Sequence, residues 1–255
     1  MTARLGYSIT GAEQAPVLVL GSSLGTTRAM WDRQIPALSE QHRVVAFDHR
    51  GHGESEVPDG PYSISELGAD VLALLDELGI ARFSYAGLSL GGMVGMWLAS
   101  EAPDRVDRLA LLCTSPALDA LPAWRDRAAS VRTDGMAAVT DVVLGRWFTP
   151  GYAAAHPDVV DTYRAMLRTT PPDGYAGCCD AIGPMDLRSR LAAITAPTLS
   201  IGGAEDPAIP PVHAERMAAA VPHASLEIVP GAAHLANVER ADEITALLLD
   251  HFGGE

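Results

Sequence analysis

Short apolar segments alternate with segments of helical periodicity along most of this chain. The apolar segments are 16–21, 43–48, 82–87, 108–113, 196–203 and 225–231. Segments that are apolar at nearly every position are typical of strands buried on both faces, and such strands occur in parallel sheets that helices cover on either side. The alternation therefore predicts an α/β fold, with a mostly parallel central sheet and helices on both of its faces.

The segments between the predicted strands carry the signals of helix ends. Ser63 and Glu66 have the spacing of a capping box, apolar residues recur at helical intervals after them, and Gly79 is a typical C-terminal stop. Further helices are predicted at 90–102, 212–220 and 239–251. The chain therefore repeats the strand and helix unit on which parallel sheets are built.

The alternation is interrupted once, from residue 116 to about residue 190. This stretch has no convincing strand, and it contains several helix-sized pieces broken at Pro150, Pro157 and Pro171-Pro172. We therefore predict a helical cap, residues 116–190, inserted into a core formed by residues 1–115 and 191–255.

Composition excludes several classes of function. The formal net charge is −14, and all 18 basic residues are arginine. Without lysine the chain cannot form a Schiff base or a Ser-Lys dyad, and so acidic a surface is a poor match for nucleic acid. The charge is uneven, because residues 116–190 hold eight Arg and nine Asp, a net charge of −1, and the rest of the chain carries −13.

Hydropathy argues against a membrane protein. No apolar run approaches the roughly 18 residues needed to cross a bilayer, and the first residues lack the cationic start and the apolar stretch of a signal peptide. We therefore expect no membrane association and a cytoplasmic location.

Neither the cysteines nor the histidines have the spacing of a metal site. Cys113, Cys178 and Cys179 give no disulfide framework and no Cys-x-x-Cys motif. His49 and His52 lie three residues apart in the Gly-rich stretch DHRGHGES, where such a pair more often shapes a turn than binds a metal. We expect neither a metal nor a cofactor.

The pentapeptide GLSLG, residues 87–91, matches the G-x-S-x-G pattern of a nucleophilic serine. It lies between a predicted strand and a predicted helix, where Gly87 and Gly91 leave room for a sharp turn. The turn places Ser89 at a helix N-terminus, where unpaired N–H groups favour developing negative charge. Ser89 is therefore the candidate nucleophile and the Leu90 N–H a candidate oxyanion donor; the alternative is that Ser89 is only a small turn residue.

A serine nucleophile needs a general base, and the base needs an acid that orients it. His234 follows the last predicted strand in a Gly-rich loop before the final helix, the last place in the chain order Ser, Asp, His. Glu205 and Asp206 both lie in the loop after the strand at 196–203; we prefer Asp206 as the acid, with Glu205 as the alternative. The rival interpretations are a structural loop histidine and a carboxylate that caps the next helix.

With these residues the chain resembles the α/β-hydrolase superfamily over nearly its whole length. The segments GSSLGTTRAMWDRQIPAL, GLSLGGMVGMWLA, RWFTP and TTPPDGYAGCCDAI are similar to the 3-oxoadipate enol-lactonase family, and the last two, from the predicted cap, are the more particular. The resemblance implies an α/β-hydrolase fold with an inserted helical lid. This sequence differs from the family pattern at Gly21-Ser22-Ser23, where the family typically has Ser-Asn-Ser. This alignment implies that the Ser23 N–H is the second oxyanion donor. If the alignment shifts by one residue, the donor is the Leu24 N–H.

The resemblance also implies the reaction, which is the hydrolysis of 3-oxoadipate enol-lactone through an acyl-enzyme in the β-ketoadipate pathway of aromatic catabolism. A chain of net charge −14 would repel this small anionic lactone unless a local cation received its carboxylate. Arg132 and Arg146 of the predicted cap are the candidates, with Trp124 and Trp147 as walls. Ion pairs on helix surfaces are an equally good interpretation of arginines in a cap.

Two other functions stay open. A general carboxylesterase or perhydrolase would use the same residues on uncharged esters, and a ligand sensor would keep the cavity without turnover. The complete set of triad candidates argues against the sensor.

Overall fold

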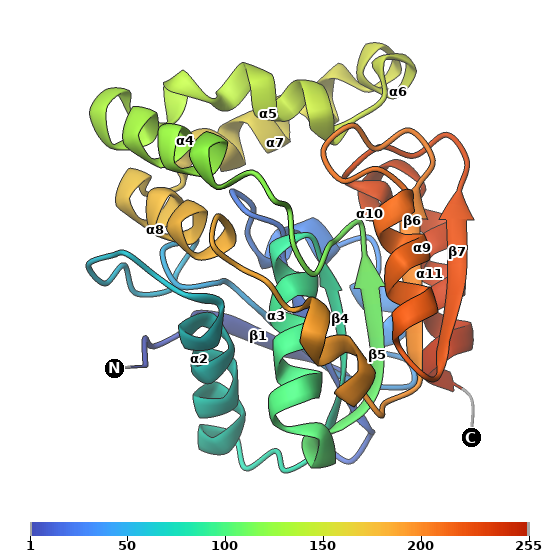
Figure 1. The fold of residues 1–255 in the computed structure, drawn as a ribbon. Helices are drawn as coiled ribbons and strands as arrows, with labels where there is room; N and C mark the ends of the chain where they lie inside the picture. The colour runs from blue at the N-terminus through green and yellow to red at the C-terminus, as the bar shows by residue number, and fades with distance from the viewer. Residues whose placement is uncertain (1, 254–255) are drawn as a thin grey trace.

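The computed structural model describes residues 2–253, and within this range seven strands form one sheet in the order β1-β3-β2-β4-β5-β6-β7 (Figure 1). Strands β2 to β7 pair in parallel, whereas β1 pairs antiparallel with β3. The strands are β1 (Tyr7–Thr10), β2 (Val17–Gly21), β3 (Arg43–Phe47), β4 (Phe83–Leu88), β5 (Val106–Leu112), β6 (Thr198–Gly203) and β7 (Ala224–Val229). The predicted α/β class with a mostly parallel sheet is confirmed.

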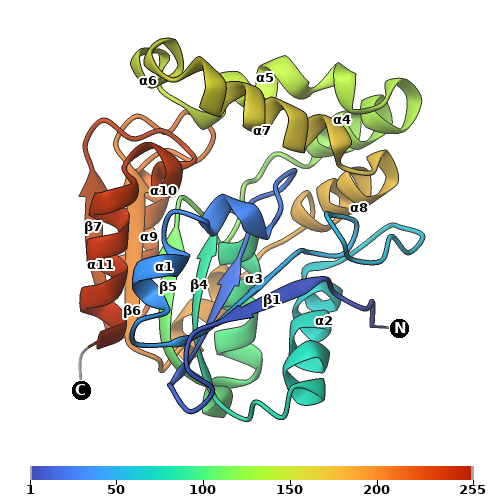
Figure 2. The same cartoon turned by 180° about the vertical axis from the view of Figure 1, so that it is seen from behind.

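Helices cover both faces of this sheet. Helices α2, α3 and α9 lie in front of it in Figure 1, and α1 and α11 lie on the face that Figure 2 turns toward the reader. The helices of the core are α1 (Ile35–Leu38), α2 (Ile64–Glu77), α3 (Leu90–Glu101), α9 (Val212–Ala220), α10 (Ala236–Glu239) and α11 (Ala241–Gly253), with 3-10 helices η1 (Arg28–Trp31), η2 (Pro103–Arg105) and η4 (Arg188–Ala193). This coverage explains why most positions of β2 to β6 are buried.

The elements of the core follow the sequence signals closely. Each predicted strand exists, with ends within two residues of the prediction. The Ser63 hydroxyl accepts the N–H of Glu66 at 3.3 Å, which is the predicted cap of α2, and Gly79 follows that helix with φ +67°. The helix expected at 239–251 is α11, which begins two residues later because Arg240 (φ −122°, ψ 50°) separates it from the short helix α10.

The segment inserted between β5 and β6 forms helices above the carboxyl ends of the parallel strands (Figure 1). Its helices are α4 (Leu121–Asp134), α5 (Thr140–Trp147), α6 (Pro150–Ala155), α7 (Pro157–Thr169) and α8 (Pro172–Ile182), with the 3-10 helix η3 (Met136–Ala138). Three of them begin at a proline, which suits the first helical position because its missing N–H would have no partner there. The two ends of the segment meet where the Leu187 N–H donates to the carbonyl of Pro116 at 2.8 Å. The division into core and cap domains at residues 116 and 190 stays a prediction.

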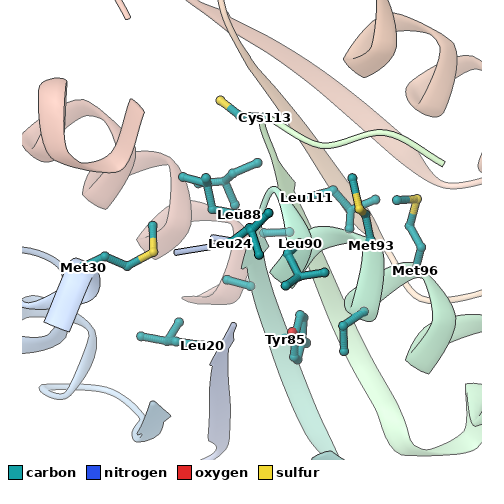
Figure 3. Close-up of a cluster of buried hydrophobic side chains, with 14 of the residues drawn as sticks. Leu20, Leu24, Met30, Tyr85, Leu88, Leu90, Met93, Met96, Leu111 and Cys113 are labelled. Atoms are coloured by element: carbon teal, nitrogen blue, oxygen red, sulfur yellow. The ribbon is translucent and has the colours of Figure 1, made fainter. Parts of the chain in front are cut away.

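One hydrophobic cluster extends from the sheet into the cap. Figure 3 shows the part of it around the turn from β4 to α3, where Leu88, Leu90 and Met93 lie among the side chains of other elements, Leu24 and Met30 included. Close packing of this kind leaves little freedom for the turn. The longest helices, α2 and α4, have 14 residues, and no helix within residues 2–253 is long and apolar enough to span a membrane.

Candidate active site

Ser89 occupies a strained turn between β4 and α3. Its φ of 56° and ψ of −113° lie in a region of backbone conformation that residues other than glycine rarely adopt. A Cβ on Gly87 would lie 2.3 Å from the backbone of Gly91, and a Cβ on Gly91 would lie 2.2 Å from the carbonyl oxygen of Gly21. The two glycines therefore let the strand, the helix and β2 approach one another, and this approach forces the backbone at Ser89 into its unusual shape.

Ser89, His234 and Asp206 form one hydrogen-bonded chain. The Ser89 hydroxyl lies 2.9 Å from Nε2 of His234, and Nδ1 of the same ring lies 2.8 Å from Oδ2 of Asp206. All three residues are buried, with Ser89 the most exposed at 8%. This is the geometry that a base needs to take a proton from a serine and to hold the imidazolium that results.

The loop after β6 fixes Asp206 and turns Glu205 away. The second carboxylate oxygen of Asp206 accepts the N–H groups of Ala208 at 2.8 Å and Ile209 at 3.0 Å. Glu205, the alternative acid, is exposed to solvent. Only Asp206 is therefore placed to orient the histidine.

The loop after β2 is tied to the serine turn and to the DHRGHG stretch. The carbonyl of Ser22 accepts the N–H of Gly91 and a hydrogen bond from His49 Nε2, both at 3.0 Å. Nε2 of His52 accepts the N–H of Gly25 at 2.9 Å, so its proton resides on Nδ1 and points to the carbonyl of Arg50 at 3.1 Å. The two histidines therefore support this loop from both ends.

Both of these histidines are neutral in the folded protein. Burial, with help from the nearby His52, lowers the pKa of His49 to about 3, and burial also lowers the pKa of His52. No cluster of three or more potential metal ligands occurs among residues 2–253.

The predicted oxyanion donor Ser23 has another partner. Its N–H donates to Sδ of Met30 at 3.2 Å, and Met30 does not line the cavity in front of Ser89. The Gly25 N–H donates to His52, so among Ser23, Leu24 and Gly25 it is Leu24 whose N–H has no acceptor among the described residues. Leu90 is the first residue of α3, so its N–H lacks an acceptor within the helix. The structure thus favours Leu24, the alternative by one residue, over Ser23.

A cavity lies at Ser89 and His234 between the core and the cap, and its empty space, together with the open solvent at its entrance, amounts to about 550 Å³. Its lining is largely apolar, from Leu24, Met93, Leu118, Val143, Ile182 and Ile209 among others. Three of the four predicted substrate-binding residues, Trp124, Arg146 and Trp147, line it. A small ligand with one charged group would fit such a lining.

The fourth predicted residue, Arg132, does not line the cavity. Its guanidinium pairs with Asp180 at 2.5 Å near the protein surface. Arg132 therefore forms an ion pair on the helix surface, which was the alternative interpretation of the cap arginines. Arg127 and Tyr175 line the cavity instead, and neither is among the predicted residues. Arg127 follows Trp124 by three residues on α4, so the two side chains lie on the same face of this helix. This spacing could have indicated from the sequence that Arg127 lies beside the predicted wall residue Trp124.

Hydrogen bonds fasten the cap to the loop that carries His234. The N–H of Leu235 donates to the carbonyl of Trp147 at 2.9 Å. The carboxylate of Glu239 accepts the N–H of Ala233 at 2.9 Å and, on the cap side, the N–H of Thr149 at 3.2 Å. The residues on either side of His234 are therefore linked to the cap, Leu235 directly and Ala233 through Glu239.

Comparison with known proteins identifies the family. A model of the alpha/beta hydrolase fold family matches residues 16–241. The chain is 37% identical to 3-oxoadipate enol-lactonase 2 of Acinetobacter baylyi over 236 residues, which are 92% of this chain and 88% of that protein. It matches the crystal structure of the enol-lactonase from Burkholderia xenovorans LB400 with a TM-score of 0.97 at 41% identity, covering 99% of this chain and 97% of that one.

A further relative, from Stutzerimonas stutzeri and described as a candidate carbamate hydrolase, RutD, is 30% identical over 243 residues, which cover 93% of this chain and 91% of that protein. The family model, the two enol-lactonases and the buried Ser89 turn agree on one family. The chain is a hydrolase that belongs to the α/β-hydrolase superfamily and, within it, to the 3-oxoadipate enol-lactonase family.

Proposed function

We propose that this protein hydrolyses 3-oxoadipate enol-lactone to 3-oxoadipate, as a step of aromatic catabolism in the β-ketoadipate pathway. The observation that carries the proposal is the hydrogen-bonded chain from Asp206 through His234 to Ser89, whose serine end faces a cavity that cap residues help to line. Relatives named as enol-lactonases, similar over nearly the whole chain, support the choice of substrate.

The first half of the reaction opens the lactone ring. Ser89 Oγ attacks the lactone carbonyl carbon while His234 Nε2 takes the hydroxyl proton, and the Asp206 carboxylate stabilises the imidazolium. The free N–H groups of Leu24 and Leu90 are the proposed donors to the oxygen that becomes negative in the tetrahedral intermediate. Collapse of this intermediate breaks the bond between the carbonyl carbon and the ring oxygen and leaves an acyl-enzyme whose chain carries an enol where the ring oxygen was attached.

The second half releases the product. His234 gives its proton to the departing enol oxygen, and the enol tautomerises to a ketone, which makes ring closure unfavourable. Water, deprotonated by His234, then attacks the ester carbonyl on Ser89, and the proton returns to Oγ as the acid leaves. Each proton transfer uses the same imidazole nitrogen, which explains why its ring is fixed on both sides.

A second candidate function is hydrolysis of other small esters or of a carbamate, which the similarity to RutD favours. Turnover of the purified protein on 3-oxoadipate enol-lactone, p-nitrophenyl acetate and ethyl carbamate separates these functions. We expect kcat/KM to be highest for the enol-lactone. A higher value for either neutral substrate would reject the proposed function and leave a hydrolase of broader or different specificity.

A further inference from the structure

We propose that Asn237 is a positioning residue for hydrolysis, which fixes the loop of His234 relative to the Leu24 N–H through Met30. This inference rests on the proposed function, because it takes His234 as the general base and the Leu24 N–H as an oxyanion donor. It does not depend on which ester or lactone the protein hydrolyses.

The two loops that this residue connects come from strands that are not neighbours. Leu24 lies in the loop after β2 and His234 in the loop after β7, and the strand order places β4, β5 and β6 between these strands. Four strand spacings amount to about 20 Å along a sheet. The hydrogen bonds of the sheet therefore do not join the two loops directly, and their relative position depends on contacts made above the strand ends.

Asn237 makes such a contact between α10 and η1. It follows His234 by three residues, it is the one asparagine of the chain, and it is fully buried. Its Nδ2 donates to the carbonyl of Met30 at 2.8 Å, and its own backbone carbonyl accepts a hydrogen bond from Nε2 of Gln34 at 2.8 Å. Because the Met30 carbonyl can only accept, the side-chain NH2 group must face η1. The segment that follows the general base is therefore bonded at two points to residues 30–34.

Met30 extends this restraint to the loop after β2. Its Sδ accepts the N–H of Ser23 at 3.2 Å and the hydroxyl of Thr26 at 3.1 Å. These two residues lie on either side of Leu24 in the sequence. A thioether is a weak acceptor, so it can hold the loop only if the backbone of Met30 is itself fixed. Since two bonds share this task, the loss of one should be mild and the loss of both should not.

The side-chain oxygen of Asn237 makes this residue suitable for a test. Oδ1 is buried and has no hydrogen-bond partner among the described residues. An unpaired buried oxygen lowers the stability of the fold. Leucine has a similar shape and would remove this oxygen, but it would leave the Met30 carbonyl without its side-chain donor. Asn237→Leu therefore exchanges one unpaired oxygen for another, and we expect the variant to fold while the link to η1 is lost.

The test uses the hydrolysis of p-nitrophenyl acetate. We expect Asn237→Leu to lower kcat about 5- to 10-fold and to leave KM within about twofold, because displaced loops impair the base and the oxyanion donor more than substrate binding. Thr198→Val is the matched control, since it also removes one buried hydrogen bond, from Thr198 Oγ1 to the carbonyl of Ala196 at 2.8 Å, at the amino end of β6. Its kcat should stay within about twofold of the wild-type value. Equal losses of kcat in the two variants, or a loss confined to KM, would overturn the assignment.

Met30→Leu tests the same link even if Asn237→Leu does not fold. This substitution nearly conserves the side-chain volume, which cores tolerate well, whereas both bonds to the loop after β2 are lost. We expect kcat to fall about 5- to 10-fold here too. If Asn237 acts through Met30, adding Asn237→Leu to Met30→Leu should lower kcat by less than about twofold more. A wild-type kcat in Met30→Leu, or fully additive losses in the double variant, would contradict the proposal.

A transition-state analogue separates this inference from the choice of substrate. Phenylboronic acid adds to a serine hydroxyl and forms a tetrahedral adduct, so its inhibition constant reports on the oxyanion site without turnover of the lactone. This constant should rise about 5- to 10-fold in Asn237→Leu and stay unchanged in Thr198→Val. The same pattern in a protein that left the enol-lactone intact would reject only the proposed substrate. Equal inhibition of the wild type and Asn237→Leu would reject the positioning role whatever the substrate, and so would a wild-type protein that phenylboronic acid does not inhibit.

Discussion

The carboxylate of Glu239 on α10 holds the cap residue Thr149 through both its hydroxyl and its backbone N–H. The same carboxylate accepts the N–H of Ala233, the residue before His234. One acidic side chain thus joins the N-terminus of α6 to the loop of the candidate general base. Correct placement of the cap and correct placement of the imidazole are therefore coupled.

Glu239→Gln tests this coupling, because the amide NH2 group cannot accept an N–H. At least one of the bonds to Thr149 or Ala233 must be lost, and His234 should be less well oriented. We expect kcat to fall about 10-fold with a smaller change in KM, since the orientation of the base acts on the chemical steps. Glu243→Gln is the control, because within residues 2–253 the carboxylate of Glu243 pairs with the exposed Arg240 alone. Equal kinetics in the two variants would show that Glu239 does not position the histidine.

The assignment of the oxyanion donor can be tested on the backbone itself. Incorporating an α-hydroxy acid at position 24 replaces the Leu24 N–H by an ester oxygen and keeps the side chain. Loss of one oxyanion donor should lower kcat about 10²- to 10³-fold. The same replacement at Ser23 removes only the bond to Met30 and should be mild, as should Ser23→Ala. The reverse ranking of the two positions would restore Ser23 as the donor.

The pKa values of His49 and His52, which bond the loop after β2, predict how the stability of the protein depends on pH. The pKa of His49 is about 3 in the folded protein, lowered by burial, and about 6.5 when unfolded. Between these values the unfolded chain binds a proton that the folded protein does not, so the free energy of unfolding falls as the pH is lowered, by about 1.4 kcal/mol per pH unit for one such group. His52, whose pKa is also lowered, acts in the same direction.

Urea unfolding at pH 7, 6 and 5 measures this slope. His49→Gln retains an N–H donor for the Ser22 carbonyl and removes the titration, so its free energy of unfolding should fall less steeply with decreasing pH. Identical slopes for the variant and the wild type would mean that His49 is not the group that titrates.

The strain at Ser89 predicts that activity and stability oppose each other at this position. Glycine adopts φ 56° and ψ −113° without the clash that a Cβ brings, whereas alanine keeps the clash. We expect Ser89→Gly to be more stable than Ser89→Ala by about 1 kcal/mol, after allowing for the greater freedom of unfolded glycine. Thermal unfolding of the two inactive variants gives the comparison; a less stable glycine variant would argue against backbone strain at the turn.

Much of the fold follows from local pattern, because buried parallel strands must be apolar throughout. Strand β1 could not be predicted from an apolar pattern, because it is a four-residue edge strand with largely exposed side chains. The candidates Ser89, Asp206 and His234 could be predicted because each follows a strand, and the carboxyl ends of parallel strands meet at one edge of the sheet.

The cap residues could not be ranked in the same way. Arg127 and Arg132 belong to one helix and have similar sequence surroundings, and only the docking of α4 on α8 decides that Arg132 meets Asp180 while Arg127 faces the cavity. The choice of oxyanion donor in the loop after β2 was equally difficult to make from the sequence. Whether Ser23 or Leu24 offers its N–H depends on Met30 and His52, which reach the loop from other segments.

The role of Ser89 as the nucleophile is tested most directly by steady-state hydrolysis of 3-oxoadipate enol-lactone by the wild-type protein and by Ser89→Ala. We predict ready turnover by the wild type and a loss of at least about 10³-fold in kcat for the variant, with the fold intact by circular dichroism. Turnover by Ser89→Ala at a rate near that of the wild type would contradict the proposed mechanism.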